Sequence, residues 1–203
     1  MSIAIETLKD RVAEYIGTSR MTHTLGVCET ALRIADCFKN IDRDDLMAAA
    51  LLHDVAKELD TAVQLDLIRE YRVPVSGEDL ETLPALHSFA AVALIKRDFP
   101  QYCKDNIISA VAKHTLGDVS MTLFDKIVYI SDYVEPGRTH PACVAVRDRL
   151  FAALSASNEV GNELAVNAAI IESVKNTEEY LSAKGSKINS RSREMLRYLL
   201  SLN

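Results

Sequence analysis

The chain has 203 residues, of which 48% are hydrophobic and 26% are charged, and its formal net charge is −6 at pH 7. This length suits one large domain or at most two small ones, and the composition is typical of a soluble globular protein. The negative charge argues against binding to nucleic acid or to an anionic membrane surface. Any phosphate ligand must therefore be held by a local cluster of cations or by a metal.

Helical spacing of apolar residues is found in nearly every segment of the chain, and alternating period-2 runs of useful length, repeats and linkers are not evident. We predict helices, in chain order, over residues 5–16, 22–38, 48–57, 61–71, 86–99, 105–114, 122–133, 143–154, 158–183 and 190–202. Gly17 is expected to stop the first helix, and Asp42 or Asp44 to cap the third. Residues 75–85 are the least regular part. The sequence therefore predicts an all-α, single-domain fold over residues 1–203.

Targeting and redox features are few. The N-terminal segment mixes acidic and basic residues too early for a secretory signal, and the longest apolar runs are far too short to span a bilayer. The four cysteines show no C-x-x-C spacing, and we interpret them as reduced core or near-core residues within helices. We expect a cytoplasmic protein without a thiolate zinc site.

The run 48–57, AAALLHDVAK, places three polar residues in an apolar helical segment. Desolvating an unpaired charge costs several kcal/mol, in order-of-magnitude terms, so buried His53, Asp54 and Lys57 must be paired or must bind a metal. Lys57 is four residues from His53 and three from Asp54, so all three can share one side of a helix. This run is a candidate site that lacks further ligands.

Those ligands are suggested by the other histidines and by a second aspartate in an apolar run. Any single histidine is more often a surface or core residue than a ligand, and we assign His140 to the surface. The pattern of four predicted helices that each carry one histidine is more informative. Imidazole and carboxylate together suit iron, manganese or zinc better than calcium, and favour a catalytic site over a structural zinc site. The candidate set is His23, His53, Asp54, His87, His114 and Asp132.

This ordered set resembles that of the HD-domain metal-dependent phosphohydrolases, so an HD-domain helical bundle is the expected fold. More narrowly, several motifs resemble the YqeK-like subgroup of symmetrical bis(5'-nucleosyl)-tetraphosphatases, which cleave diadenosine tetraphosphate. These motifs are R-x-x-H-T-L-G-V (20–27), A-A-L-L-H-D-V-A-K (49–57), H-S (87–88), A-V-x-K-H-T (110–115), S-D-Y-V-E-P-G-R (131–138) and N-T-E-E-Y-L (176–181). The resemblance implies a core over residues 18–140 and C-terminal helices over 158–202 that complete a nucleotide pocket.

Carried over residue by residue, the resemblance implies a role for each matching position. The implied metal ligands are His23, His53, Asp54 and Asp132, while His87 and His114 either hold a second metal or face the substrate phosphates, which we favour. The implied catalytic residues are Asp54, Lys57, His87 and His114. The implied substrate contacts are His23, Gly26, Lys57, His87, Ser88, His114, Asp132, Arg138, Asn176, Thr177 and Tyr180. Iron is the favoured divalent metal, with manganese, cobalt, zinc and magnesium as alternatives, and one or two ions can be present.

The expected reaction is attack of metal-activated water on a β-phosphorus of diadenosine tetraphosphate, which gives two ADP. The expected partner is a dinucleoside polyphosphate or an ADP-like nucleotide, and a homodimer is left open. Two alternatives stay open as well: another HD-domain phosphohydrolase acting on nucleoside monophosphates or deoxynucleotides, or a nucleotide-sensing module without turnover. Taken alone, Lys57 and Arg138 also fit solvated surface residues, and residues 176–181 fit one face of an amphipathic helix.

Overall fold

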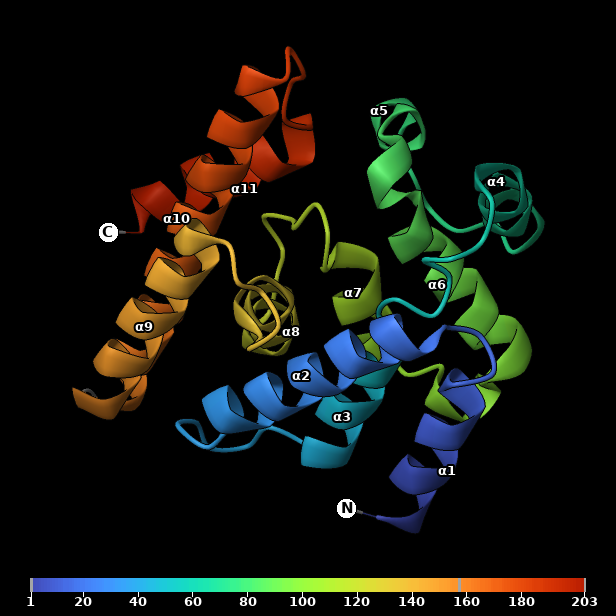
Figure 1. Cartoon of the computed structure of the whole chain (residues 1–203), viewed down its shortest axis with the longest axis horizontal. Helices are drawn as coiled ribbons and strands as arrows, with labels where there is room; N and C mark the ends of the chain where they lie inside the picture. Colours follow the sequence, from blue (N-terminus) through green and yellow to red (C-terminus); the bar gives the residue numbers. More distant parts are fainter. Residues whose placement is uncertain (1, 157, 203) are drawn as a thin grey trace.

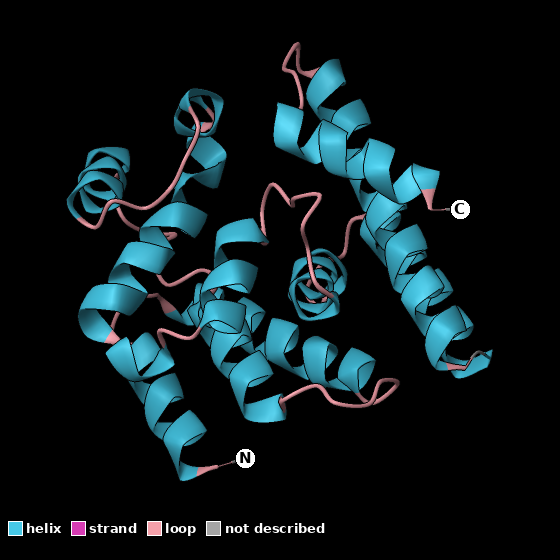
Figure 2. Ribbon diagram, turned by 180° about the vertical axis from the view of Figure 1, so that it is seen from behind, coloured by secondary structure: helices cyan, strands magenta, loops and turns pink. Residues whose placement is uncertain are grey.

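The computed structural model describes residues 2–156 and 158–202, and every regular element in these two ranges is a helix (Figures 1 and 2). The α-helices are α1 (Ile3–Val12), α2 (Thr18–Ala35), α3 (Arg43–Leu52), α4 (Thr61–Glu70), α5 (Gly77–Glu81), α6 (Leu86–Asp98), α7 (Asp105–Lys113), α8 (Leu123–Val134), α9 (Pro141–Ala156), α10 (Glu159–Ala183) and α11 (Ser190–Ser201). Two short 3₁₀ helices, η1 (Leu83–Ala85) and η2 (Pro100–Tyr102), precede α6 and α7. The predicted all-α fold is confirmed.

Helix starts follow from local polar side chains. The Asp42 carboxylate accepts a hydrogen bond from the Asp45 backbone at the start of α3, which confirms one of the two predicted caps. Thr122 and Asp125 form a reciprocal capping box at the start of α8. Each such cap stabilises its helix by about 1 kcal/mol, because it satisfies a backbone donor without an intrahelical partner.

Two predicted boundaries in the N-terminal half are wrong. Helix α1 ends at Val12, and Gly17 does not stop it but is the extended N-cap residue of α2, with ψ 167°. Helix α2 therefore begins at Thr18, four residues before the predicted start at Thr22. The Gly17 amide donates to Glu58 at 2.8 Å, so this turn is tied to the chain beyond α3.

The third helix lies earlier in the chain than predicted, because it begins at Arg43 and ends at Leu52, not at Lys57. Beyond it the backbone tightens into turns, in which the Lys57 amide donates to the Asp54 carbonyl at 2.9 Å. The imidazole Nδ1 of His53 lies 2.7 Å from the carbonyl of Ala50, one of the last carbonyls that the helix leaves free. His53 and Asp54 are thus at the helix end, not at its centre, and do not share a helix face with Lys57.

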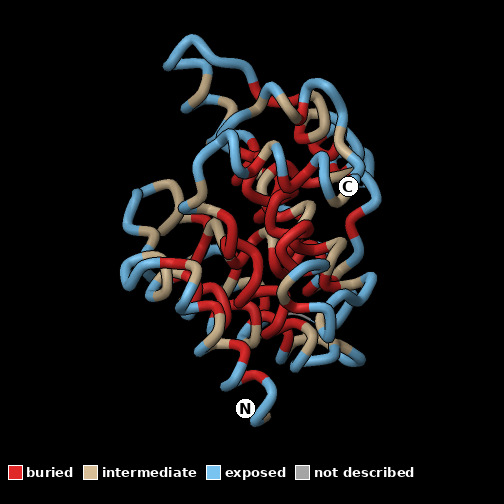
Figure 3. The backbone as a smooth tube through the Cα atoms, turned by 90° about the vertical axis from the view of Figure 1, so that its right-hand side faces the viewer, coloured by how far each residue is buried: buried red, intermediate tan, exposed pale blue. Residues whose placement is uncertain are grey.

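The core is built around α3, α6 and α8. All seven residues from Leu46 to Leu52 are buried, as are all ten from Leu86 to Ile95. Helix α8 is seen end-on near the middle of Figure 1, and it packs against α2 and α7 as well as against α9 and α10. Figure 3 shows that the buried residues are gathered in the interior of the molecule. Burial of each large aliphatic side chain there stabilises the folded state by about 1.5–3 kcal/mol.

The last helix is tied to two earlier segments. The Arg191 guanidinium donates to Asp79 of α5 at 2.7 Å and to Asp118 of the loop after α7 at 2.8 Å. The Ser192 hydroxyl donates to the Leu116 carbonyl of the same loop at 2.6 Å. Helix α11 therefore fixes the loop that follows His114.

The cysteine prediction holds only in part, because Cys37 lies in the turn after α2 and not within a helix. All four thiols are free, and Cys28 is buried within α2. Cys103, however, is exposed and lies between η2 and α7, so its predicted place in a helical core is wrong. Among the described residues, no helix combines the length and apolar character needed to cross a membrane.

Candidate metal centre

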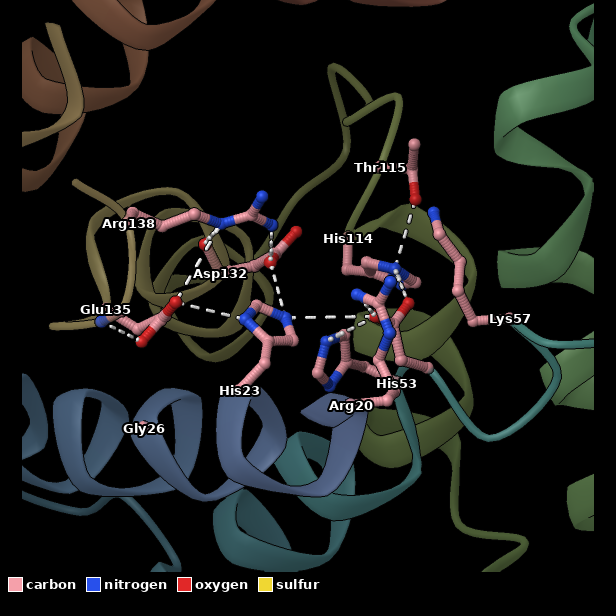
Figure 4. A network of polar contacts seen from close by, with 12 residues as sticks. Arg20, His23, Gly26, His53, Lys57, His114, Thr115, Asp132, Glu135 and Arg138 are labelled. Atoms are coloured by element: carbon pink, nitrogen blue, oxygen red, sulfur yellow. Dashed lines mark hydrogen bonds and ion pairs between the residues drawn. The ribbon is translucent and has the colours of Figure 1, made fainter. Parts of the chain in front are cut away.

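Four helices bring histidine and aspartate side chains together at the centre of the molecule (Figure 4). His23 lies within α2, His53 directly follows α3, His114 follows α7, and Asp132 lies in the last turn of α8. Ligand atoms of His23, His53 and Asp132 lie within 4.8 Å of one another, and so do those of His53, Asp54 and His114. His53 belongs to both groups, so the predicted ligands form one cluster.

The protonation of His53 leaves a nitrogen free for a metal. Its Nδ1 must carry the hydrogen, because the Ala50 carbonyl beside it can only accept. Its Nε2 therefore presents a lone pair, is buried, and has no hydrogen-bond partner among the described residues. An unpaired buried polar atom costs about 1–3 kcal/mol. Burial also lowers the pKa of His53, which keeps the ring neutral and able to ligate at pH 7.

The Asp54 carboxylate lies at the centre of the cluster. Its Oδ2 accepts from Arg20 at 3.0 Å and lies 3.5 Å from His53 Nε2. Its Oδ1 lies 3.2 Å from His87 Nε2 and 3.6 Å from His114 Nε2. Burial alone would raise the pKa of Asp54, but the imidazoles of His53, His114 and His87 outweigh it and hold the pKa well below its ordinary value. Asp54 is therefore ionised at neutral pH.

Asp132 is the second carboxylate of the cluster. Its Oδ1 lies 3.0 Å from His23 Nε2, although the geometry is not that of a hydrogen bond, and it accepts from Arg138 at 2.7 Å. Burial opposes ionisation, but His23 and Arg138 together hold the pKa of Asp132 well below its ordinary value. Two ionised carboxylates, together with the Nε2 atoms of His23 and His53, which have no hydrogen-bond partner among the described residues, are a donor set that fits a divalent transition metal.

A second group of side chains lies on the Asp54 side of the cluster. His87 and His114 face each other, with 3.1 Å between their Nε2 atoms, and the Thr115 hydroxyl lies within 3.2 Å of both. The Lys57 ammonium lies 3.2 Å from each ring nitrogen of His87. Burial lowers the pKa of His87 to about 4, so this ring is neutral at pH 7. Lys57 thus reaches the cluster through His87.

Two residues in contact with the ligands, Arg20 and Glu135, were missed by the sequence reasoning. Arg20 bonds to Asp54, and Glu135 Oε1 lies 3.1 Å from His23 Nδ1. A signal existed for both, because Arg20 is three residues before His23 on the same helix and Glu135 is three residues after Asp132. Spacing alone did not reveal that Arg20 contacts Asp54 or that Glu135 contacts His23.

The other predicted contacts lie outside the cluster. Gly26 is next to Glu135, and Ser88 is fully buried, with its hydroxyl donating to the Ala85 carbonyl. On α10, Asn176 donates to the Tyr133 hydroxyl at 3.2 Å, whereas Tyr180 is 56% exposed. His140 is exposed, as predicted.

Cavities flank the cluster on two sides. One of about 110 Å³ is lined by His114, Asp132 and Thr177, and its lining continues through shared residues into another of about 390 Å³. The shared residues are Thr115, Thr177, Ile188 and Ser192. A third cavity, of about 570 Å³, is lined by His23, Gly26 and Glu135 on the α2 side. The cavity on the α10 side therefore reaches the cluster at His114 and Asp132, whereas the cavity on the α2 side meets His23 on its Glu135 side.

A fold and a ligand set of this kind define a known class. The model of the HD domain family matches residues 20–137, a range that runs from Arg20 to just beyond Glu135. The chain therefore belongs to the HD domain family.

Relatives that match nearly the whole chain carry more specific names than the family does. A Staphylococcus aureus (strain NCTC 8325 / PS 47) protein named symmetrical bis(5'-nucleosyl)-tetraphosphatase is 28% identical over 196 residues, which cover 96% of this chain and 93% of that protein. A Bacillus subtilis (strain 168) protein of the same name is 30% identical over 186 residues, covering 91% and 89%. The crystal structure of a predicted HD superfamily hydrolase involved in NAD metabolism from Clostridium acetobutylicum matches with a TM-score of 0.83 at 28% identity, covering 98% and 97%. The predicted resemblance is confirmed.

Proposed function

We propose that this protein is a metal-dependent hydrolase that cleaves diadenosine tetraphosphate symmetrically into two ADP. The observation that carries the proposal is the complete cluster of His23, His53, Asp54 and Asp132 in a chain whose near-full-length relatives are named for this activity. The reaction consumes one water: a new P–O bond forms at a β-phosphorus, and the bridging P–O bond to the other ADP breaks.

These four residues would hold one divalent metal, with iron favoured and manganese, cobalt, zinc and magnesium as alternatives. Such a metal lowers the pKa of bound water toward neutrality and offsets charge on phosphoryl oxygens. His87 and His114 then face the substrate phosphates and do not hold a second ion. The free Nε2 of His53 and the two ionised carboxylates support this assignment.

Phosphate binding must depend on local cations, because the chain carries a net charge of −6. Arg138 is 42% exposed while it bonds to Asp132, so its guanidinium can reach a ligand in the adjoining cavity. Lys57 supplies a second positive charge beside His87. A charge-assisted hydrogen bond from each would contribute about 1.5–3 kcal/mol to binding of an anionic ligand.

His87 is the better of the two histidines to provide a proton to the leaving ADP. His114 Nδ1 lies 2.8 Å from the Val111 carbonyl and must carry its hydrogen there, so its Nε2 is an acceptor. The hydrogen between the facing rings therefore belongs to His87 Nε2, while His87 Nδ1 accepts from Lys57. This arrangement places a proton-bearing nitrogen backed by a cation at the edge of the cluster.

Product analysis tests the proposal. Purified protein supplied with metal and diadenosine tetraphosphate should yield ADP alone, whereas equimolar ATP and AMP would contradict symmetrical cleavage. Binding without turnover would favour a sensing module, and preferential release of phosphate from nucleoside monophosphates would favour the other phosphohydrolases. Elemental analysis of protein purified without added metal should find about one ion per chain, as four such ligands hold one.

A further inference from the structure

The buried carboxylate of Glu135 contacts His23 from the side opposite to the metal cluster. Its Oε1 lies 3.1 Å from His23 Nδ1, and its Oε2 accepts from the Gly137 amide at 2.5 Å. Glu135 is only 3% exposed and lies in the turn directly after α8. Figure 4 shows Glu135 on one side of the His23 ring and His53 on the other.

The space for this carboxylate depends on two glycines. A Cβ atom at Gly26 would lie 2.6 Å from Glu135 Oε2, and one at Gly137 would lie 2.9 Å from both carboxylate oxygens. The turn itself is held by Arg147, whose Nη1 donates to the Glu135 carbonyl at 2.9 Å. Because the backbone of the turn is held, a larger residue at position 26 would have to displace the carboxylate itself from its place beside His23.

His23 needs this contact because, unlike His53 and His114, it does not lie at the end of a helix. His53 and His114 lie at helix ends, and their Nδ1 atoms donate to the carbonyls of Ala50 and Val111, three residues earlier. His23 lies inside α2, where the preceding carbonyls already accept helix hydrogen bonds. Its Nδ1 therefore needs an acceptor from elsewhere in the fold.

We propose that Glu135 is a positioning residue for the metal, because it fixes the hydrogen of His23 on Nδ1 and so leaves Nε2 free for the ion. Gly26 and Gly137 are glycines, in this proposal, because the carboxylate occupies the space of their side chains. An ionised carboxylate can only accept a hydrogen bond, so it selects one tautomer and one ring orientation. The inference rests on the metal-ligand part of the proposed function and not on the substrate.

The first test is Mn²⁺ binding by metal-stripped protein, measured by titration calorimetry without nucleotide. In Glu135→Gln, one amide group cannot accept from both His23 and Gly137, so we expect the Mn²⁺ affinity to fall by about 10- to 100-fold. Glu29→Gln is the matched control, because it removes an exposed carboxylate from the same cavity wall and should bind Mn²⁺ as wild type does. Wild-type affinity in Glu135→Gln would overturn the proposal.

The second test reads the tautomer directly. Burial would lower the pKa of His23, but Asp132 and Glu135 outweigh it and raise the pKa, so the spectra are recorded at a pH high enough to deprotonate the ring. Under this condition, imidazole ¹⁵N shifts of metal-free wild type should show the hydrogen of His23 on Nδ1, and Glu135→Gln should move population to the Nε2–H form. A purely structural role for Glu135 would lower stability without changing the tautomer, and that outcome would overturn the proposal. These readouts contain no substrate, so failure to hydrolyse diadenosine tetraphosphate would contradict the proposed function alone.

The third test is Gly26→Ala, which keeps the Glu135 side chain but adds a methyl group where its carboxylate lies. Alanine in a helix interior is favoured over glycine by about 1 kcal/mol, so helix propensity predicts a stabilised α2. The close approach of the added Cβ to the Glu135 carboxylate predicts instead a Mn²⁺ affinity as low as that of Glu135→Gln. Wild-type Mn²⁺ affinity in Gly26→Ala would overturn the explanation of this glycine.

Discussion

The ammonium nitrogen of Lys57 lies 3.2 Å from each ring nitrogen of His87, which joins the turns after α3 to the first turn of α6. This contact places a cation beside the cluster but outside its ligand set. Burial lowers the pKa of Lys57, and the charges of Asp54 and Asp132 oppose that effect. The proposed function assigns this positive charge to phosphate binding.

Replacement of this lysine should reduce catalysis without removing the metal. For Lys57→Met we expect kcat/KM to fall by about 10- to 150-fold, which corresponds to loss of one charge-assisted hydrogen bond of about 1.5–3 kcal/mol. Steady-state kinetics on diadenosine tetraphosphate measures this, with metal content determined in parallel. Lys96→Met, at the opposite end of α6, should keep wild-type kinetics. An unchanged kcat/KM in Lys57→Met would contradict a role in phosphate binding.

Removal of the metal that the cluster is proposed to hold should lower the stability of the folded protein. At metal concentrations a hundredfold above Kd, binding stabilises the folded state by about 2.7 kcal/mol. We therefore expect a chelator to lower the thermal midpoint of wild type in a scanning fluorimetry experiment. His53→Ala should lose both metal and hydrolysis, and its midpoint should not respond to the chelator. A midpoint shift of wild-type size in His53→Ala would show that the stabilising ion is held elsewhere.

The ion pair between α11 and α5 predicts a pH-dependent stability. Burial would raise the pKa of Asp79, but the bonds from Arg191 and Ser76 outweigh it, so the folded-state pKa is lowered. A lowered folded pKa stabilises the protein above the ordinary Asp pKa of about 3.9, and this stability is lost as the pH falls through the folded value.

For Arg191→Met we expect a loss of about 1.5–3 kcal/mol in the free energy of unfolding at pH 7. The gap from wild type should narrow progressively below about pH 4. Urea denaturation at several pH values measures both quantities. Arg197→Met, on the exposed side of the same helix, is the control and should follow wild type at each pH. A gap that stays constant down to the acid range would contradict the assigned ion pair.

Gly117 has φ +68°, and a Cβ there would lie 2.2 Å from the sulfur of Met195 in α11. Gly117→Ala should lower the free energy of unfolding by at least about 1–2 kcal/mol, because a non-glycine residue is strained in this conformation. Met195→Ala in the same chain should relieve the steric part only, giving a favourable coupling of about 0.5–3 kcal/mol in a double-mutant cycle. Gly77→Ala, which meets no atom within 4 Å, is the control. Additive effects of the two substitutions would contradict direct contact.

The ligand cluster could be predicted from the sequence because histidine and aspartate in apolar helical runs are chemically conspicuous. The end of α3 at Leu52 could not be predicted, because Val55 and Ala56 continue the apolar pattern beyond it. The hydrogen bond from the His53 imidazole to the Ala50 carbonyl at this end is visible only in the structure. Glu135 could not be assigned either. Its partner His23 is 112 residues away, and only the packing of α2 on α8 brings the two together.

The three histidines with defined Nδ1 partners also have a consequence for assembly of the site. His23, His53 and His114 each direct Nε2 toward the cluster because folding has already committed the other nitrogen. The Nε2 atoms of His23 and His53 have no hydrogen-bond partner among the described residues, so an ion bound there would relieve the cost of burying them without reordering the rings. Folding thus places the side chains that would hold an ion, and a bound ion would in turn stabilise the folded chain.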